Sequence, residues 1–154
     1  MTESSSNNTD NNEIDIKIPP NSVEAEQSIL GGLMLDNSAW DKIADIIVKS
    51  DFYRKDHQII FDGISSLIES AEACDVVTLS EYLDNKGNLD SVGGLEYLAT
   101  LANETAGSAN VVSYAKILRE RSVLRSLIAA GNEISGSAFS TEGRSASELV
   151  DQAE

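Results

Sequence analysis

Apolar residues recur at intervals of three and four positions along most of the chain, which is the spacing of one helix face. Three sets keep this spacing: Ala25, Ile29, Leu30, Leu33 and Met34; Trp40, Ile43, Ala44 and Ile47; and Ile60, Ile64, Leu67 and Ile68. Shorter helices are predicted at about 78–85 and 95–102, and strand signals are sparse. The pattern therefore predicts an all-α fold of about five or six helices.

The last part of the chain has a different apolar pattern. A long helix is predicted from about 111 to 134, and a second one at 145–153 follows the polar stretch GSAFSTEGRS, so the two form a hairpin. The apolar residues of the long helix fall on more than one face, with Tyr114, Leu118 and Leu124 on one stripe and Val123 and Leu127 outside it. Two apolar sides indicate either pairing with another chain or packing on the domain's own core.

Composition divides the chain into three parts. Residues 1–18 open with MTESSSNNTDNN, which is too polar to repay the entropy of ordering, so a disordered acidic tail is predicted there. Residues 19–109 are predicted to form a compact multi-helix subdomain. Residues 110–154 are predicted to form the C-terminal helical hairpin.

Two glycines interrupt the apolar end of the first predicted helix, in the stretch PPNSVEAEQSILGGLM. Gly31 and Gly32 could belong to a phosphate-binding loop, a close packing contact or a helix stop. A phosphate loop needs a lysine and a serine or threonine behind its glycines, and neither follows here. We therefore expect the glycines to let another helix approach closely.

Two helix starts carry a reciprocal capping pattern, in which a hydroxyl residue is followed three positions later by an acid. The pairs are Thr78 with Glu81 and Ser145 with Glu148. Each pair predicts the first residue as the N-cap of a helix.

The charge balance restricts the partners of the chain. Lys and Arg number 11 against 26 Asp and Glu, a formal net charge of −15, which argues against direct DNA binding and favours basic protein partners. No apolar run approaches the roughly 18 residues that span a bilayer, and the N-terminus lacks the features of a signal peptide. We expect no membrane association and a cytoplasmic protein.

The chain has one histidine, His57, and one cysteine, Cys74, which excludes the usual zinc spacings and a disulfide framework. His57 is interpreted as a polar partner for a loop backbone, and Cys74 as a buried structural thiol without a cationic neighbour. No catalytic, cofactor or metal site is predicted. The alternatives are a small cytoplasmic helical enzyme that uses these two residues, or a stand-alone helical adaptor.

Basic residues concentrate in the segment KILRERSVLR. Lys116 and Arg119 are interpreted as part of a solvated, salt-bridged helix face. Arg121 and Arg125, four positions apart, are candidates for fixing a helix contact between subunits by pairing with carboxylates. The predicted oligomer interface comprises Arg121, Arg125, Leu124 and Leu127.

Several motifs, taken in order, resemble the N-terminal domain of DnaB-type replicative DNA helicases. They are PPNSVEAEQSILGGLMLD, DFYRKDHQIIF, DVVTLSEYL, GGLEYLATLANET and YAKILRERSVLRSLI, and the resemblance covers about 18–154. The chain departs from the family pattern in two loops, at Ala71, Ala73 and Cys74 and at Ala106 and Gly107.

The resemblance implies an all-helical collar of a hexameric ring, whose protomers pair through the terminal hairpin. It implies binding to the C-terminal domain of primase, with a helicase loader as a further candidate partner, and no catalysis by this segment. ATP and Mg would belong to a separate motor domain of the full-length family. The positions that the resemblance assigns to partner binding are Tyr97, Ile128, Ile134 and Glu24.

Overall fold

The structure is a computed structural model, and it describes residues 17–154. Within this range it contains seven α-helices, three short 3₁₀ turns and no strand, so the predicted all-α class is confirmed. The predicted tail, 1–18, lies outside the described residues except for its last two positions. The helices are α1 (Val23–Leu35), α2 (Trp40–Ile43), α3 (Lys55–Glu69), α4 (Val76–Asn85), α5 (Gly94–Glu104), α6 (Val111–Phe139) and α7 (Ala146–Ala153).

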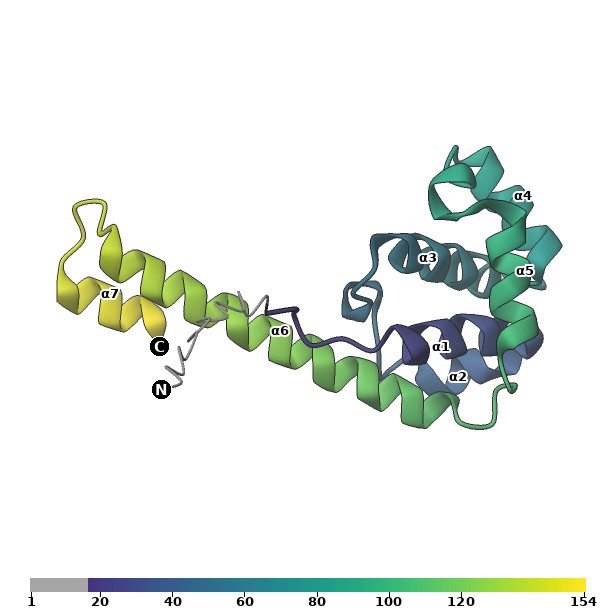
Figure 1. Cartoon of the computed structure of the whole chain (residues 1–154), viewed down its shortest axis with the longest axis horizontal. Helices are drawn as coiled ribbons and strands as arrows, with labels where there is room; N and C mark the ends of the chain where they lie inside the picture. Colours follow the sequence, from purple (N-terminus) through teal and green to yellow (C-terminus); the bar gives the residue numbers. More distant parts are fainter. Residues whose placement is uncertain (1–16) are drawn as a thin grey trace, which may run out of the picture.

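The helices form a body and an extension. Helices α1 to α5 pack together as the body, and the first turns of α6 lie against α1 and α2 (Figure 1). The rest of α6 runs away from the body, and α7 folds back against its far end to form a hairpin (Figure 1). Over residues 17–154, no helix combines the length and the apolar character needed to cross a membrane.

Helix α1 is the centre of the body, because it packs against α3, α5 and α6. Its predicted apolar residues are all buried, and Ile29, Leu30 and Leu33 are completely inaccessible. Burial extends beyond the predicted face, since Glu26, Gly31 and Gly32 are also buried. A helix surrounded by three others has little exposed surface, which explains why its polar face is so short.

The paired glycines of α1 are packing contacts, as predicted. A Cβ atom at Gly31 would lie 2.2 Å from the backbone oxygen of Leu101 in α5, and one at Gly32 would lie 3.3 Å from the backbone oxygen of Gly107. The backbone of α5 therefore touches α1 at Gly31, and a loop touches it at Gly32. The second neighbour is a loop, whereas the sequence predicted a helix.

One of the two predicted helix caps is confirmed. Ser145 caps α7, where its hydroxyl accepts a hydrogen bond from the amide of Glu148 (3.2 Å) and its own amide donates to the Glu148 carboxylate (3.3 Å). The prediction for α4 was wrong, because Asp75 is its N-cap and Thr78 is the reciprocal partner, with both bonds at 2.9 Å. An aspartate can cap a helix as well as a threonine can, so the cap lies three residues earlier.

Two helix lengths differ from the prediction. Helix α2 ends at Ile43, and a turn replaces the predicted continuation to Ile47. Helix α6 continues to Phe139, through residues that were predicted to form the loop. Gly131 and Gly136 lie within it in open surroundings, and each lowers helix propensity without ending the helix.

Replacing Gly31 with alanine should lower the free energy of unfolding by about 1–3 kcal/mol, because the new methyl group would push α5 away from α1. Gly131→Ala is the matched control, since nothing lies within 4 Å of its Cβ position. It should raise stability by about 0.5–1 kcal/mol through helix propensity. Urea denaturation of both variants checks this, and a stabilised Gly31→Ala would contradict the close contact.

Candidate docking surfaces

Within residues 17–154, Cys74 and His57 have different hydrogen-bond surroundings and do not bond each other. Cys74 is buried, as predicted, and burial, with a smaller contribution from Asp75, raises the pKa of its thiol to about 12. A thiol in this state is a poor nucleophile. His57 belongs to a separate network that does not include Cys74. Between residues 17 and 154, no three His, Cys, Asp or Glu side chains form a group that could hold a metal ion.

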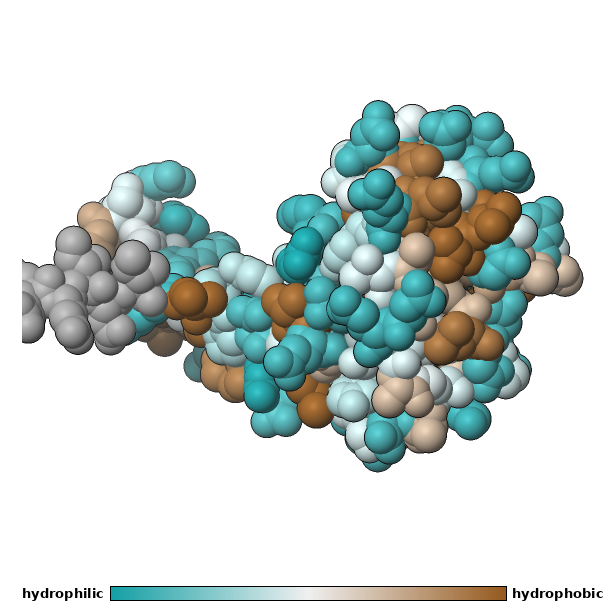
Figure 2. Space-filling view, turned by 45° about the vertical axis from the view of Figure 1, so that its right-hand side comes forward, coloured by the Kyte–Doolittle hydropathy of each residue, from teal (hydrophilic) through white to brown (hydrophobic). Residues whose placement is uncertain are grey.

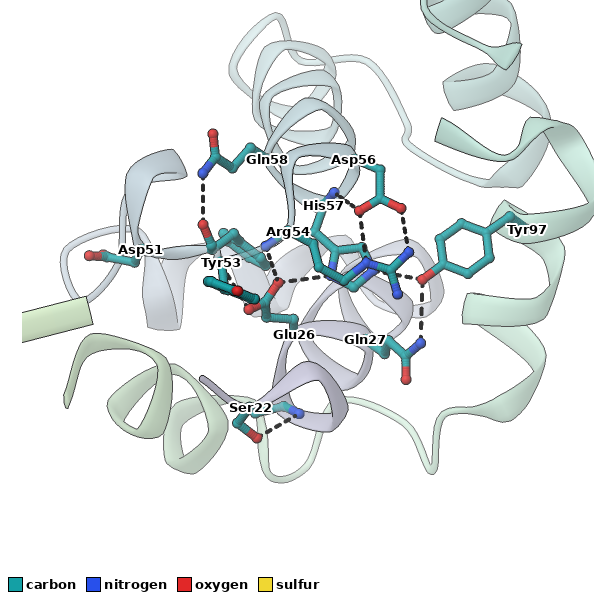
Figure 3. A network of polar contacts seen from close by, with 12 residues as sticks. Ser22, Glu26, Gln27, Asp51, Tyr53, Arg54, Asp56, His57, Gln58 and Tyr97 are labelled. Carbon is teal, nitrogen blue, oxygen red and sulfur yellow. Dashed lines mark hydrogen bonds and ion pairs between the residues drawn. The ribbon is translucent and has the colours of Figure 1, made fainter. Parts of the chain in front are cut away.

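His57 connects three helices of the body through its side chain (Figure 3). Its Nδ1 atom lies 2.8 Å from Oε1 of Glu26 in α1, and its Nε2 atom lies 2.6 Å from the hydroxyl of Tyr97 in α5. The exposed fractions of His57 and Glu26 are 0% and 1%. The predicted partner of His57 was a loop backbone, and that prediction was wrong because two side chains bind both ring nitrogens.

Both carboxylate oxygens of Glu26 are occupied. Besides His57, the backbone amides of Tyr53 and Arg54 donate to Glu26, at 2.9 Å and 3.3 Å. All three partners are nitrogen atoms, two from backbone amides and one from the imidazole ring. Glu26 thus ties α1 to the segment that precedes α3.

Arg54 and Asp56 border this network at its outer side (Figure 3). The guanidinium of Arg54 makes two hydrogen bonds to the Asp56 carboxylate and lies 5.8 Å from the centre of the Tyr97 ring. Partial burial acts to raise the pKa of Asp56, but the bonds from Arg54 and the charge of its neighbours outweigh it and leave the pKa below its usual value. Asp56 therefore stays ionised and holds Arg54 beside the ring.

Two of the predicted partner-binding residues lie on the body. Tyr97 is partly buried, with its hydroxyl directed into the network, where Gln27 also donates to it at 3.3 Å. Glu24 is exposed in the first turn of α1 and makes no hydrogen bond among the described residues. Sequence reasoning missed Glu26, two positions further on, which is the acidic residue that α1 buries.

The other two predicted partner-binding residues lie on the hairpin. Ile128 and Ile134 are each 47% exposed, so neither belongs to the core of this chain. Figure 1 places α5 and the free end of α6 at opposite ends of the molecule. One chain therefore does not gather the four predicted positions into a single patch.

Apolar side chains are exposed along the hairpin. Leu124 and Leu127 of the predicted oligomer interface are 38% and 67% exposed, and neighbours such as Val123 and Phe139 are also exposed. Figure 2 shows apolar residues at the surface of both the body and the helix that leaves it. A groove of about 450 Å³ lies between α6 and α7 and is lined by residues that include Ile134, Ala138 and Leu149.

Arginines of α6 hold the hairpin to the body. Arg125 donates to the backbone oxygens of Pro20 (2.8 Å) and Asp51 (2.7 Å), and it lies 5.5 Å from the centre of the Tyr53 ring. Its guanidinium thus binds carbonyls of its own chain, whereas the sequence predicted pairing with carboxylates of another subunit. Arg121 makes no hydrogen bond or ion pair in the part of the chain that the structure describes, and its interface role stays a prediction.

Arg119 was interpreted as part of a solvated, salt-bridged helix face, and the structure agrees, since its side chain is 53% exposed and forms an ion pair. The pair joins it at 2.8 Å to Asp51, whose side chain is 1% exposed. The other carboxylate oxygen of Asp51 accepts a hydrogen bond from the amide of Val48 (2.8 Å). The buried acid therefore links α6 to the segment between α2 and α3.

The chain is similar to known proteins of one family. The sequence model of the family described as "DnaB-like helicase N terminal domain" matches residues 18–120. The replicative DNA helicase DnaB of Haemophilus influenzae is 42% identical over 139 residues, which are 90% of this chain and 30% of that protein. The replicative DNA helicase DnaC of Bacillus subtilis is 36% identical over 138 residues, again 90% of this chain and 30% of the relative. The chain thus spans about 30% of the length of the curated relatives it matches.

Solved structures share the fold. The N-terminal domain of DnaB helicase from Mycobacterium tuberculosis superimposes with a TM-score of 0.85 and 37% identity, over 88% of this chain and 95% of that one. A DnaB-like replicative helicase, solved to describe its interactions with primase, matches with a TM-score of 0.65 and 20% identity. That match covers 84% of this chain and 31% of the other, and it shows the fold alone.

Replacing Arg125 with methionine should lower the free energy of unfolding by about 2 kcal/mol, because two backbone carbonyls lose a charged donor. Arg121→Met is the matched control on the same helix and should change stability by less than about 0.5 kcal/mol. Urea denaturation at low protein concentration measures both. Equal losses in the two variants would contradict the role of Arg125 in holding the hairpin.

Proposed function

Because the chain belongs to the DnaB-like helicase N-terminal domain family, we propose that it serves hexamer assembly and primase docking in a replicative DNA helicase. The observation that carries the assembly part is the apolar surface of the α6–α7 hairpin. Exposed leucine and isoleucine side chains gain about 25 cal/mol per Å² when a partner covers them. A second copy of the hairpin is the partner that the family resemblance implies.

Primase docking is proposed on the body and on the hairpin together. Tyr97 has the character of an interface anchor, since a partly exposed aromatic side chain that is held in place loses little entropy on binding. Ile128 and Ile134 offer exposed aliphatic surface at the other end of the molecule. A primase that contacts both surfaces would touch two protomers of an assembly, since one protomer keeps them apart. The relative described with its primase interactions supports this choice of partner.

The remaining proposals concern DNA, cofactors, catalysis, a loader and location. The net charge of −15 favours protein partners over the DNA backbone. We propose that the segment binds no cofactor and performs no catalysis, and that ATP and Mg act in the motor domain of the full-length family. A helicase loader is a further proposed partner, and the cytoplasm is the proposed location.

Replacing Leu127 with aspartate should abolish self-association, because a charge would enter the proposed hairpin contact. Light scattering of the unaltered chain should show an average mass that rises with concentration towards a dimer, whereas the variant should remain a monomer. Val77→Asp is the matched control, since Val77 is 63% exposed against 67% for Leu127 but lies on the body. A strictly monomeric unaltered chain over a wide concentration range would remove the hairpin-interface argument.

Replacing Tyr97 or Ile134 with alanine should weaken binding of the primase C-terminal domain about tenfold or more, because each removes an anchoring side chain. Isothermal titration calorimetry with the primase domain of the same organism measures the affinity, and circular dichroism checks the fold. Leu95→Ala is the control for Tyr97→Ala, because Leu95 lies in the same helix and is 50% exposed. If both variants fold and bind the primase domain with unchanged affinity, Tyr97 and Ile134 are not primase-binding residues.

A further inference from the structure

We propose that His57 is a positioning residue for docking, and that the buried pair of Glu26 and His57 fixes the direction of the Tyr97 ring at the surface. The inference rests on the proposed function, since it concerns how Tyr97 meets a primase. It goes beyond that function by assigning a role to two side chains that a partner cannot touch. Both are at most 1% exposed.

A chain of hydrogen bonds leads outward from Glu26 to Tyr97. Nδ1 of His57 bonds Oε1 of Glu26 (2.8 Å), and Nε2 of the same ring bonds the Tyr97 hydroxyl (2.6 Å). Gln27 donates to the same hydroxyl oxygen at 3.3 Å. The hydroxyl therefore has two bonding partners on its inner side. A partner can contact only the exposed part of the Tyr97 ring, which is partly buried.

The ring itself is enclosed from several directions. The His57 and Tyr97 rings are nearly parallel, with an angle of 4° and centroids 6.0 Å apart, and Arg54 lies over the Tyr97 ring. Gly93, the N-cap of α5, has φ of +102° and makes room for the side chain, because a Cβ there would lie 2.7 Å from Cβ of Tyr97. Tyr97 thus has a defined direction before any partner arrives.

A polar pair in the core is a poor choice if stability is the only requirement. Removing a carboxylate and an imidazole from water is unfavourable, and apolar residues of similar volume often stabilise a fold as well or better. A hydrogen bond adds a fixed direction, which apolar packing lacks. Through His57, the pair bonds the hydroxyl of Tyr97, the aromatic residue predicted to dock a partner on the body. A fixed direction of that ring matters for docking.

Replacing His57 with asparagine tests the proposal, because the asparagine amide can bond Glu26 in place of Nδ1 but has no atom at the place of Nε2. Tyr97→Phe removes the other partner of the same bond and keeps the ring. In titrations of the 154-residue chain with the primase C-terminal domain, each should weaken binding about five- to tenfold. The variant that combines both substitutions should lose no more affinity than either single variant, because each of the three lacks the same hydrogen bond between His57 and Tyr97.

Side-chain J couplings of residue 97 supply a readout that a loss of stability alone would not move. They should report one χ1 rotamer in the unaltered chain and averaging in both single variants. Tyr82→Phe is the control, since the Tyr82 hydroxyl makes no hydrogen bond within residues 17–154, and it should change neither affinity nor couplings.

The outcomes separate the two proposals. If Tyr97→Ala weakens binding while His57→Asn and Tyr97→Phe bind normally, the result contradicts the positioning role of His57 and supports the docking role of Tyr97. If Tyr97→Ala also binds normally, the docking role itself falls. Additive losses in the double variant would mean that the hydroxyl meets the partner directly, which also overturns the proposal. Should His57→Asn fail to fold, unchanged affinity and couplings in Tyr97→Phe are sufficient to overturn it.

Discussion

A single buried carboxylate connects most of the body. Glu26 lies in the central helix, and its two oxygens bind the amides of Tyr53 and Arg54 and the ring of His57, which in turn binds Tyr97. A buried carboxyl group is unfavourable without such partners, so these contacts stabilise its position in the core. The position of α5 relative to α1 and α3 therefore depends on this carboxylate as well as on the close backbone contact at Gly31.

The body and the hairpin differ in how much of their apolar surface is buried. In the body, buried side-chain nitrogen and oxygen atoms all have hydrogen-bond partners among the described residues, and the apolar core is closed. The hairpin has no buried residue beyond Leu118 and leaves isoleucine, leucine, valine and phenylalanine in water. The body therefore has a buried core of its own, whereas most apolar side chains of the hairpin beyond Leu118 are exposed in one chain.

The sequence predicted local features well, because helix periodicity and glycine spacing depend only on residues that are close together in the chain. The helices, the hairpin and the packing role of Gly31 could be found in this way. The long-range polar contacts could not, since Glu26 and Asp51 look like ordinary acids beside helix starts and their partners lie elsewhere in the chain. Charged residues next to apolar ones, as in EAEQSIL and KSDFY, were the one available signal that either acid might be buried.

The continuous helix α6 has a mechanical consequence. From Arg125, the last residue of α6 bonded to the body, to Phe139 the helix carries the hairpin about 20 Å beyond the body at 1.5 Å per residue. A stiff rod of this length acts as a lever, so a tilt of about 10° at its base would displace the tip by about 4 Å. The few side chains that hold this base, Arg119 and Arg125 with Asp51, therefore fix the angle between the hairpin and the body.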